Sequence, residues 1–281
     1  MKHTMKHLLR RLMATFLLLS AFSCVFAQHE RIHSTMIGGG SASIYDTYLS
    51  PYTYKGGTVH ILRETRRELQ HPLIHIDGLT FQTLLDVDAS FVKSPAKNVE
   101  EYAGGARYSL AWLYRLPFFD KTGDTASSPF DLHVGPAVSG YLGGIYNDRN
   151  GNNPGQAKAD LMVDITAMGQ YRFRLLNRNC NLRYQVTFPF FGIAFSPNYG
   201  QSYYEAFVLE QRDHNVVFAN FANMPSMRHL LTFDIPIRPT SRTTLRIGYA
   251  GQFMQSTFNN LRYHSYTHSF MIGLTQTLNR L

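Results

Sequence analysis

Two pairs of histidines are the first residues in this sequence whose spacing suggests chemistry. His264 and His268 stand four residues apart in the segment YHSYTH, and His71 and His75 have the same spacing. On a helix this spacing can bring two imidazoles to one zinc ion. On a strand it separates them by about 13 Å, far beyond Zn–N bonds of about 2 Å. We therefore interpret them as rim or loop histidines and expect no metal site.

The motifs that mark nucleotide, zinc and redox sites do not occur in the sequence. It has no phosphate-loop GKS or GKT, no HExxH and no CxxC. Three consecutive glycines, Gly38 to Gly40, fit a strand of small residues better than a dinucleotide fingerprint. We therefore expect no cofactor.

Residues 1–27 have the pattern of a secretory signal peptide. Four basic residues precede an apolar stretch from Met13 to Ala27, and the alternatives are an uncleaved anchor helix or cleavage before a lipidated Cys24. This segment holds four of the 27 Lys and Arg residues and none of the 19 acidic ones, so its removal lowers the formal charge from +8 to +4. That charge, without any Lys/Arg-rich run, does not indicate a nucleic-acid partner. Only Cys180 then remains, so we expect no intramolecular disulfide.

Residues 28–281 are predicted to form one all-β domain. In residues 159–176 apolar side chains alternate with polar and charged ones, which predicts a strand with one apolar face. The same period of two recurs along the chain. It predicts ten strands, near 37–49, 58–69, 73–92, 100–116, 131–147, 159–176, 181–196, 227–238, 243–259 and 264–279.

The predicted strands are too long for an ordinary sheet. Strands in globular proteins usually have about 5–6 residues, whereas several here have 16 to 18. Sixteen residues span about 53 Å, enough to cross an apolar band about 25 Å tall at a tilt of ~40°. A closed barrel also satisfies every backbone hydrogen bond in lipid. We predict a closed antiparallel transmembrane β-barrel of about ten strands, with eight or twelve as alternatives because connection 117–130 is long enough to hide a hairpin.

The lengths of the connections predict the orientation of the barrel. An even number of strands returns both ends to the periplasm, and the longest connection, 197–226, then lies outside. The other outer loops are expected at 50–57, 93–99, 147–158 and 260–263. Because loop 197–226 is rich in aromatic and apolar residues, we expect it either to plug the mouth or to bind an extracellular ligand.

Nine charged residues are predicted to share the inner face of the barrel. They are Arg107, Arg115, Asp160, Asp164, Arg172, Arg174, Arg183, Asp234 and Arg246. Because side chains fill a small barrel, we expect these charges to pair in a network that blocks free diffusion. We interpret this network as an electrostatic core that holds the barrel together, with a narrow anion-selective pore as the alternative.

These features resemble the single-chain outer-membrane β-barrel proteins of Gram-negative bacteria, and more narrowly their families of unknown function. The resemblance rests on the signal peptide, the alternating strands and a final strand at the C-terminus. It implies localisation in the outer membrane, contact with outer-membrane lipid, and the barrel-assembly machinery as a partner during biogenesis.

The resemblance also brings enzymatic alternatives. Omptin proteases are ten-stranded barrels that activate a water with an Asp-x-Asp pair facing an Asp-x-His pair. Asp86 and Asp88 match the first pair, and Asp213 and His214 resemble the second but are adjacent. Barrel lipases use a His and a Ser two residues apart, a pattern that occurs nowhere after residue 27. A secreted soluble glycan-binding β-sandwich is the remaining alternative. We favour a non-enzymatic barrel with a structural, surface-binding or narrow-pore role.

Overall fold

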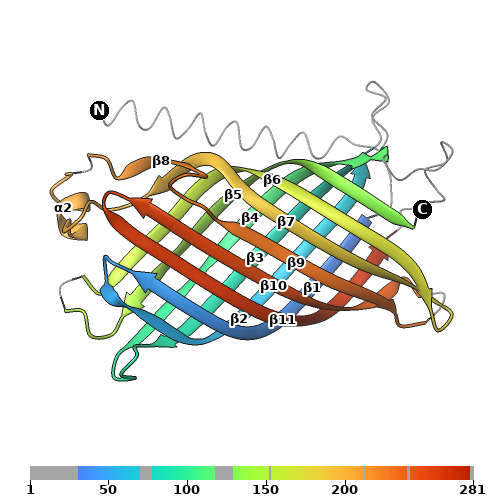
Figure 1. The fold of residues 1–281 in the computed structure, drawn as a ribbon, viewed down its shortest axis with the longest axis horizontal. Helices are drawn as coiled ribbons and strands as arrows, with labels where there is room; N and C mark the ends of the chain where they lie inside the picture. The colour runs from blue at the N-terminus through green and yellow to red at the C-terminus, as the bar shows by residue number, and fades with distance from the viewer. Residues whose placement is uncertain are drawn as a thin grey trace.

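The protein is described by a computed structural model that covers residues 31–69, 78–117, 129–151, 153–211, 213–238 and 241–278 (Figure 1). Its strands are β1 (Arg31–Asp46), β2 (Ser50–Leu69), β3 (Leu79–Lys93), β4 (Glu100–Leu116), β5 (Phe130–Asn147), β6 (Gly155–Leu175), β7 (Arg178–Phe195), β8 (Val216–Asn220), β9 (Met227–Pro236), β10 (Thr243–Phe258) and β11 (Leu261–Leu278). A short helix, α2 (Tyr203–Phe207), lies between β7 and β8. In the described part of the chain, no helix is long and apolar enough to cross a membrane.

The strands form one closed antiparallel sheet. Neighbours in the chain pair from β1 to β7, then β7 pairs with β9, and β10 and β11 lead back to β1. The short strand β8 also pairs with β7, along Phe191–Phe195, while β9 pairs along Asn181–Thr187. Because β8 and β9 follow each other beside β7, they fill one position in the wall. The predicted ten-stranded barrel is therefore confirmed.

Most of the wall strands are as long as the alternation predicts. Nine of the ten wall positions hold strands of 15 to 21 residues. The prediction was wrong for segment 50–57, which begins β2 rather than forming an outer loop, because its ladder with β1 continues to the turn at 47–49. The predicted strand start at 73–77 and most of connection 117–130 lie outside the described residues.

The barrel has two ends, which we call the loop end and the terminal end (Figure 1). The loop end carries the connections 47–49, 94–99, 148–154, 196–226 and 259–260, and the terminal end carries the start of β1 and the end of β11. At the loop end, Asn259 and Asn260 join β10 to β11 with φ values of 49° and 61°. Two positive φ angles match the right-handed twist of a tight hairpin, and asparagine tolerates them well.

The two faces of the wall have opposite chemistry. On β6, the outward residues Leu161, Ile165 and Tyr171 are 37%, 45% and 45% exposed, respectively. The inward residues Asp164 and Thr166 of the same strand are at most 1% exposed. The apolar face of the alternating pattern therefore points out of the barrel and the polar face fills the lumen, as is typical of barrels that cross membranes.

Candidate functional site

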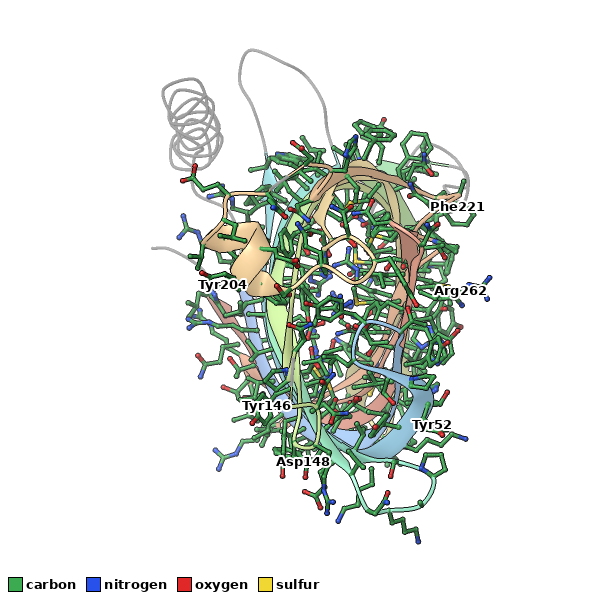
Figure 2. The ribbon with its side chains drawn as sticks, turned by 90° about the vertical axis from the view of Figure 1, so that its left-hand side faces the viewer. Tyr52, Tyr146, Asp148, Tyr204, Phe221 and Arg262 are labelled. Carbon is green, nitrogen blue, oxygen red and sulfur yellow. The ribbon has the colours of Figure 1, made fainter. Side chains whose placement is uncertain are left out.

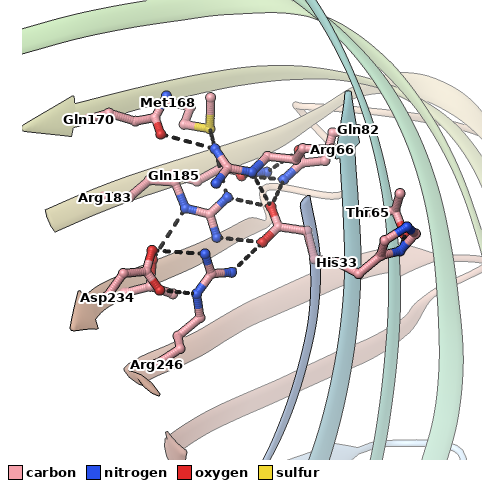
Figure 3. A network of polar contacts seen from close by, with 12 residues as sticks. His33, Thr65, Arg66, Gln82, Met168, Gln170, Arg183, Gln185, Asp234 and Arg246 are labelled. Atoms are coloured by element: carbon pink, nitrogen blue, oxygen red, sulfur yellow. Dashed lines mark hydrogen bonds and ion pairs between the residues drawn. The ribbon is translucent and has the colours of Figure 1, made fainter. Parts of the chain in front are cut away.

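A buried carboxylate on β2, Glu64, accepts hydrogen bonds from several strands and forms the centre of a polar network. Figure 3 labels the partners Gln82, Arg183 and Arg246. Arg183 donates two hydrogen bonds to it, one of them 2.8 Å from Nη2 to Oε2. Arg246 donates through Nη1 to Oε2 at 2.6 Å, and Gln82 donates through Nε2 to Oε1 at 2.6 Å. The Nε atom of Arg66 lies 3.4 Å from Glu64 Oε1. The carboxylate of Glu64 thus contacts three guanidinium groups and one amide.

A second carboxylate balances part of this positive charge. Asp234 accepts two hydrogen bonds from Arg246, from Nε at 2.5 Å and from Nη2 at 2.9 Å. Arg183 also donates from Nε to the hydroxyl of Thr232 at 3.2 Å. The side chains of Glu64, Arg183 and Arg246 are fully buried. Buried charges are costly unless they are paired and hydrogen-bonded, and this arrangement supplies bidentate contacts to both arginines.

The Glu64 network crosses the lumen from one wall to the opposite one. Glu64 stands on β2 and Arg183 on β7, and five steps separate these strands in either direction around the ring. The adjacent pair Gln82 and Gln185 links β3 to β7 through two hydrogen bonds of 2.8 and 3.0 Å. Opposing walls are therefore in direct contact through side chains in the terminal half of the barrel.

Further bridges cross the half of the barrel nearer the loop end. Lys158 on β6 lies 2.8 Å from Asp46 on β1, again between strands on opposite sides of the ring. Arg107 on β4 contacts Asp160 on β6 through hydrogen bonds of 2.7 and 2.9 Å. The guanidinium of Arg107 lies 4.8 Å from the centroid of the Tyr141 ring, an attractive cation–π arrangement.

The spaces left between these bridges are small. One interior cavity of about 40 Å³ is bordered by Asp86, Arg228 and Gln252, and a second of about 40 Å³ by Lys158 and Tyr263. Cavities of this size have room for a few water molecules at most. Side chains of the described residues therefore cross the lumen at several levels.

The structure places eight of the nine predicted lumen charges in four ion-paired groups and leaves Arg174 outside them. Arg183, Asp234 and Arg246 belong to the Glu64 network, while Arg107 with Asp160 and Asp164 with Arg228 form separate pairs. Arg115 and Arg172 both contact Asp131 near the terminal end, at 2.7 and 2.5 Å. Arg174 differs, because it is exposed beyond the network and donates to Asn177 in the turn after β6. At Arg174, strand β6 therefore extends beyond the part of the lumen that side chains fill.

The residues that resemble an omptin site lie in two separate environments. Asp86 is buried, contacts the His60 imidazole and accepts a 3.0 Å hydrogen bond from Gln252. Asp213 and His214 lie in the long loop segment, where their backbone carbonyls accept hydrogen bonds from Asn198 and Asn259, respectively. The described contacts do not join the two pairs. Among the described residues, no three His, Cys, Asp or Glu side chains could hold a metal ion together.

The predicted ligand-binding loop is ordered around α2. Ser202 caps this helix in a capping box with Glu205, and the Tyr203 hydroxyl accepts a 2.6 Å hydrogen bond from the Ala157 backbone N–H. Burial raises the pKa of Tyr203. In Figure 2, Tyr204 lies at the edge of the barrel mouth, and its side chain is exposed. A cleft of about 710 Å³ between α2 and the rim of β5 and β6 is bordered by Tyr102, Tyr146 and Tyr204.

Part of the same loop also lies over the lumen. Met224 and Ala219 are 5% and 0% exposed and pack against Met162 and Met254 on the inner wall. Other residues of the loop remain highly exposed although they are apolar. They include Tyr199, Tyr204, Phe207, Val208, Leu209, Val216, Phe218 and Phe221. The loop thus combines features of the two predicted roles, a partial cover of the mouth and an exposed apolar surface.

A more polar pocket of about 580 Å³ opens at the loop end, between three connections. It is lined from turn 47–49 and the first residues of β2, from loop 94–99, and from residues 147–150. Tyr52, Asn98 and Arg149 are among its lining residues. Its size lies within the usual range of small-molecule sites, about 300–1,000 Å³.

Sequence reasoning missed the central residue of the network. In segment 58–69 charged residues occupy both faces of the predicted strand, so the sequence does not by itself place Glu64 and Arg66 inside the barrel. The position of these residues in the alternation could have placed them inside. His60, Leu62, Glu64 and Arg66 occupy every second position of β2, so they share one face, and all four are buried. Lys158 was missed because it precedes the predicted start of its strand at residue 159.

Comparison with known proteins supports the barrel fold and identifies the family. Outer membrane protease OmpT from Escherichia coli superposes with a TM-score of 0.52 at 9% identity, covering 90% of this chain and 98% of that chain. The transport unit of the autotransporter AIDA-I from Escherichia coli gives 0.47 at 8% identity, covering 89% and 90%. The translocator domain of NalP from Neisseria meningitidis gives 0.39 at 11% identity, covering 96% and 95%. No curated protein matches this chain in sequence. Residues 7–281 match the family described as "Protein of unknown function (DUF3316)", and the chain belongs to that family.

Proposed function

We propose that this protein is an occluded barrel of the outer membrane that acts as a binding scaffold through its loop end. The observation that carries this proposal is the contact between opposing walls, above all Glu64 with Arg183 and Asp46 with Lys158. A lumen crossed by buried ion pairs at several levels does not provide an open path for ions or solutes. The structural contribution of these pairs and the surface role of the loops are then separate functions of one chain.

Two features support a membrane location and a role at the loop end. The exposed outer face of the barrel is apolar along the strands, with Leu142 at 70% and Phe270 at 75% exposure, which suits contact with lipid. The loop end holds the pocket of about 580 Å³ and the cleft of about 710 Å³ beside α2. Binding sites are commonly carried by loops on a rigid scaffold.

Planar-bilayer recordings test the proposal directly. Protein whose folding is verified by heat-dependent gel mobility should insert without producing steady conductance steps. A variant that clears both crossings, with Glu64→Ala, Arg183→Ala and Arg246→Ala at the first and Asp46→Ala and Lys158→Ala at the second, should produce such steps and serves as the positive control. Steady ion-selective conductance by the unmodified protein would overturn the proposed occluded state and favour the narrow anion pore.

A further inference from the structure

The pocket at the loop end is built by three connections that hold one another in place. Asn150 in the third connection donates from Nδ2 to the Leu49 carbonyl of the first at 3.1 Å. The third connection is joined twice to the start of β4, directly after the second connection, because the Asp148 N–H donates to the Glu100 carbonyl at 3.1 Å and the Glu100 N–H donates to Asp148 Oδ1 at 3.0 Å. Asn147 also donates from Nδ2 to the Tyr54 hydroxyl at 3.1 Å. These links cross between connections rather than staying within one.

The base of the pocket is fixed by buried polar groups. Asn147 is 3% exposed and its Nδ2 also donates to Glu101 Oε1 at 2.8 Å, while Glu101 itself is 1% exposed. Ser94 closes the second connection by donating to Asn98 Oδ1 at 3.0 Å and accepting from the Val99 N–H at 3.3 Å. Such a site is already formed before a ligand arrives, which lowers the entropic cost of binding.

Three groups in this pocket are available to a ligand. Tyr52 is 60% exposed and borders the pocket from the start of β2. Arg149 is exposed, and none of the described residues pairs with its guanidinium. Asn98 uses its amide oxygen within its own loop, which leaves its Nδ2 group without a partner among the described residues. Figure 2 shows Tyr52 and Asp148, the neighbour of Arg149, at the same side of the mouth.

Around the pocket, the exposed cations that form no ion pair with a described residue, Lys97 and Arg149, outnumber the exposed carboxylate without such a pair, Asp148. Asp148 is engaged with the backbone of Glu100, and Glu100 pairs with Lys93 at 2.7 Å. Arg149 is an exposed cation that lines the pocket, whereas the exposed Lys97 lies in the same loop as Asn98 but outside the lining. An aromatic ring, an amide donor and a guanidinium around one preformed cavity are the groups that recognise a sugar ring carrying a carboxylate, since guanidinium binds carboxylate in a bidentate manner.

We propose that this pocket binds an acidic saccharide from the external medium. Tyr52 stacks on the apolar face of a sugar ring, Arg149 pairs with the carboxylate, and Asn98 donates to a hydroxyl or carboxylate oxygen. The proposal rests on the proposed function, because it takes the loop end as the binding face, and it adds the chemical class of the ligand.

Titration calorimetry on the folded full-length protein in detergent tests this assignment. The probes are a galacturonic acid trisaccharide and the neutral galactose trisaccharide of the same length. We expect the acidic probe to bind at least tenfold more tightly than the neutral one. Arg149→Gln should weaken binding of the acidic probe about tenfold, the loss of one charge-assisted contact, and should change binding of the neutral probe less than twofold. Tyr52→Ala should weaken both.

Arg262→Gln is the matched control, because it removes the same charge from an exposed loop-end position that does not line the pocket. It should leave both affinities unchanged. Equal binding of both probes, equal effects of the Arg149 and Arg262 substitutions, or no binding to a protein that is folded and silent in bilayers would overturn the saccharide assignment alone. Steady conductance by the unmodified protein would instead remove the proposed function on which the assignment rests.

Discussion

Replacing Glu64 with alanine should destabilise the barrel more than the loss of any exposed charge. The substitution removes both carboxylate oxygens at the centre of the network. Arg183 then loses both of its ion-pair contacts and keeps only the Thr232 hydroxyl at 3.2 Å and a 3.9 Å contact to the Met168 sulfur. Arg246 is less affected, because its two hydrogen bonds to Asp234 remain.

The magnitude follows from the burial of the group that loses its partner. Arg183 is fully buried, and removal of one partner of a buried ion pair costs about 3–5 kcal/mol because the remaining charge is uncompensated. Since Asp234 still balances Arg246 and Arg66 keeps its 3.0 Å hydrogen bond to Gln170, most of the expected cost comes from the guanidinium of Arg183. We therefore expect Glu64→Ala to lower the free energy of unfolding by about 3–5 kcal/mol. Glu64→Ala with Arg183→Met, which removes the orphaned charge, should recover at least half of that loss.

Urea unfolding of protein refolded into lipid vesicles measures this difference. The folded fraction is read from the mobility of unboiled samples on SDS gels, because folded and unfolded membrane barrels usually migrate differently. The control is Glu68→Ala, an exposed glutamate on the same strand, which should change stability by less than about 0.5 kcal/mol. The reasoning is refuted if Glu64→Ala stays within about 1 kcal/mol of the unmodified protein, since no buried charge would then have been orphaned.

Two further substitutions probe other contacts. Arg107→Ala leaves the Asp160 carboxylate buried without its two hydrogen bonds, so it should cost about 3–5 kcal/mol in the same urea assay; the exposed Arg262→Ala should cost nearly nothing, and equal effects would contradict the prediction. The hydrogen bonds from the backbone and hydroxyl of Ser202 hold the pKa of Glu205 below its usual range. The α2 cap should therefore persist at neutral pH and be lost as the pH falls through that lowered pKa. Hydrogen exchange of the α2 amides, corrected for intrinsic rates, should show this step in the unmodified protein and not in Glu205→Gln; a step of equal size in both would sink the idea.

The barrel was predictable because lipid enforces a simple pattern. A strand that crosses an apolar layer needs apolar side chains on the face toward that layer along its whole length. The alternation of apolar and polar residues therefore continues for 15 residues or more, which makes it easy to recognise in the sequence. Strand β6 illustrates this, since alternation alone located it to within four residues at its start and one at its end. The ends of strands were harder to predict than their middles. The first residues of β2 are polar and small, which is typical of a loop, and only their pairing with β1 shows that they belong to the strand.

The interior was less predictable, because partners across the lumen are far apart in the chain. Glu64 and Arg183 are separated by 119 residues and Glu64 and Arg246 by 182. The alternation along a strand can show that a residue faces inward. It does not show how far along the barrel axis the residue lies, because that depends on the tilt of the strands and on their register. The pocket at the loop end poses the same problem, because it is formed by three connections whose proximity follows from closure of the barrel.

The cross-lumen bridges and the loop-end pocket are connected by the geometry of the wall. The three connections of the pocket leave from the ends of β1 to β6, so their spacing is set by the cross-section of the barrel at that end. Asp46, the last residue of β1, is held against Lys158, near the start of β6, at 2.8 Å. This ion pair fixes the distance between the strands that carry the first and third connections, and Asn150 then reaches the Leu49 carbonyl across them. A buried pair that contributes little net stability can still fix geometry in this way, so the charges inside the barrel and the shape of its binding surface follow from the same contacts.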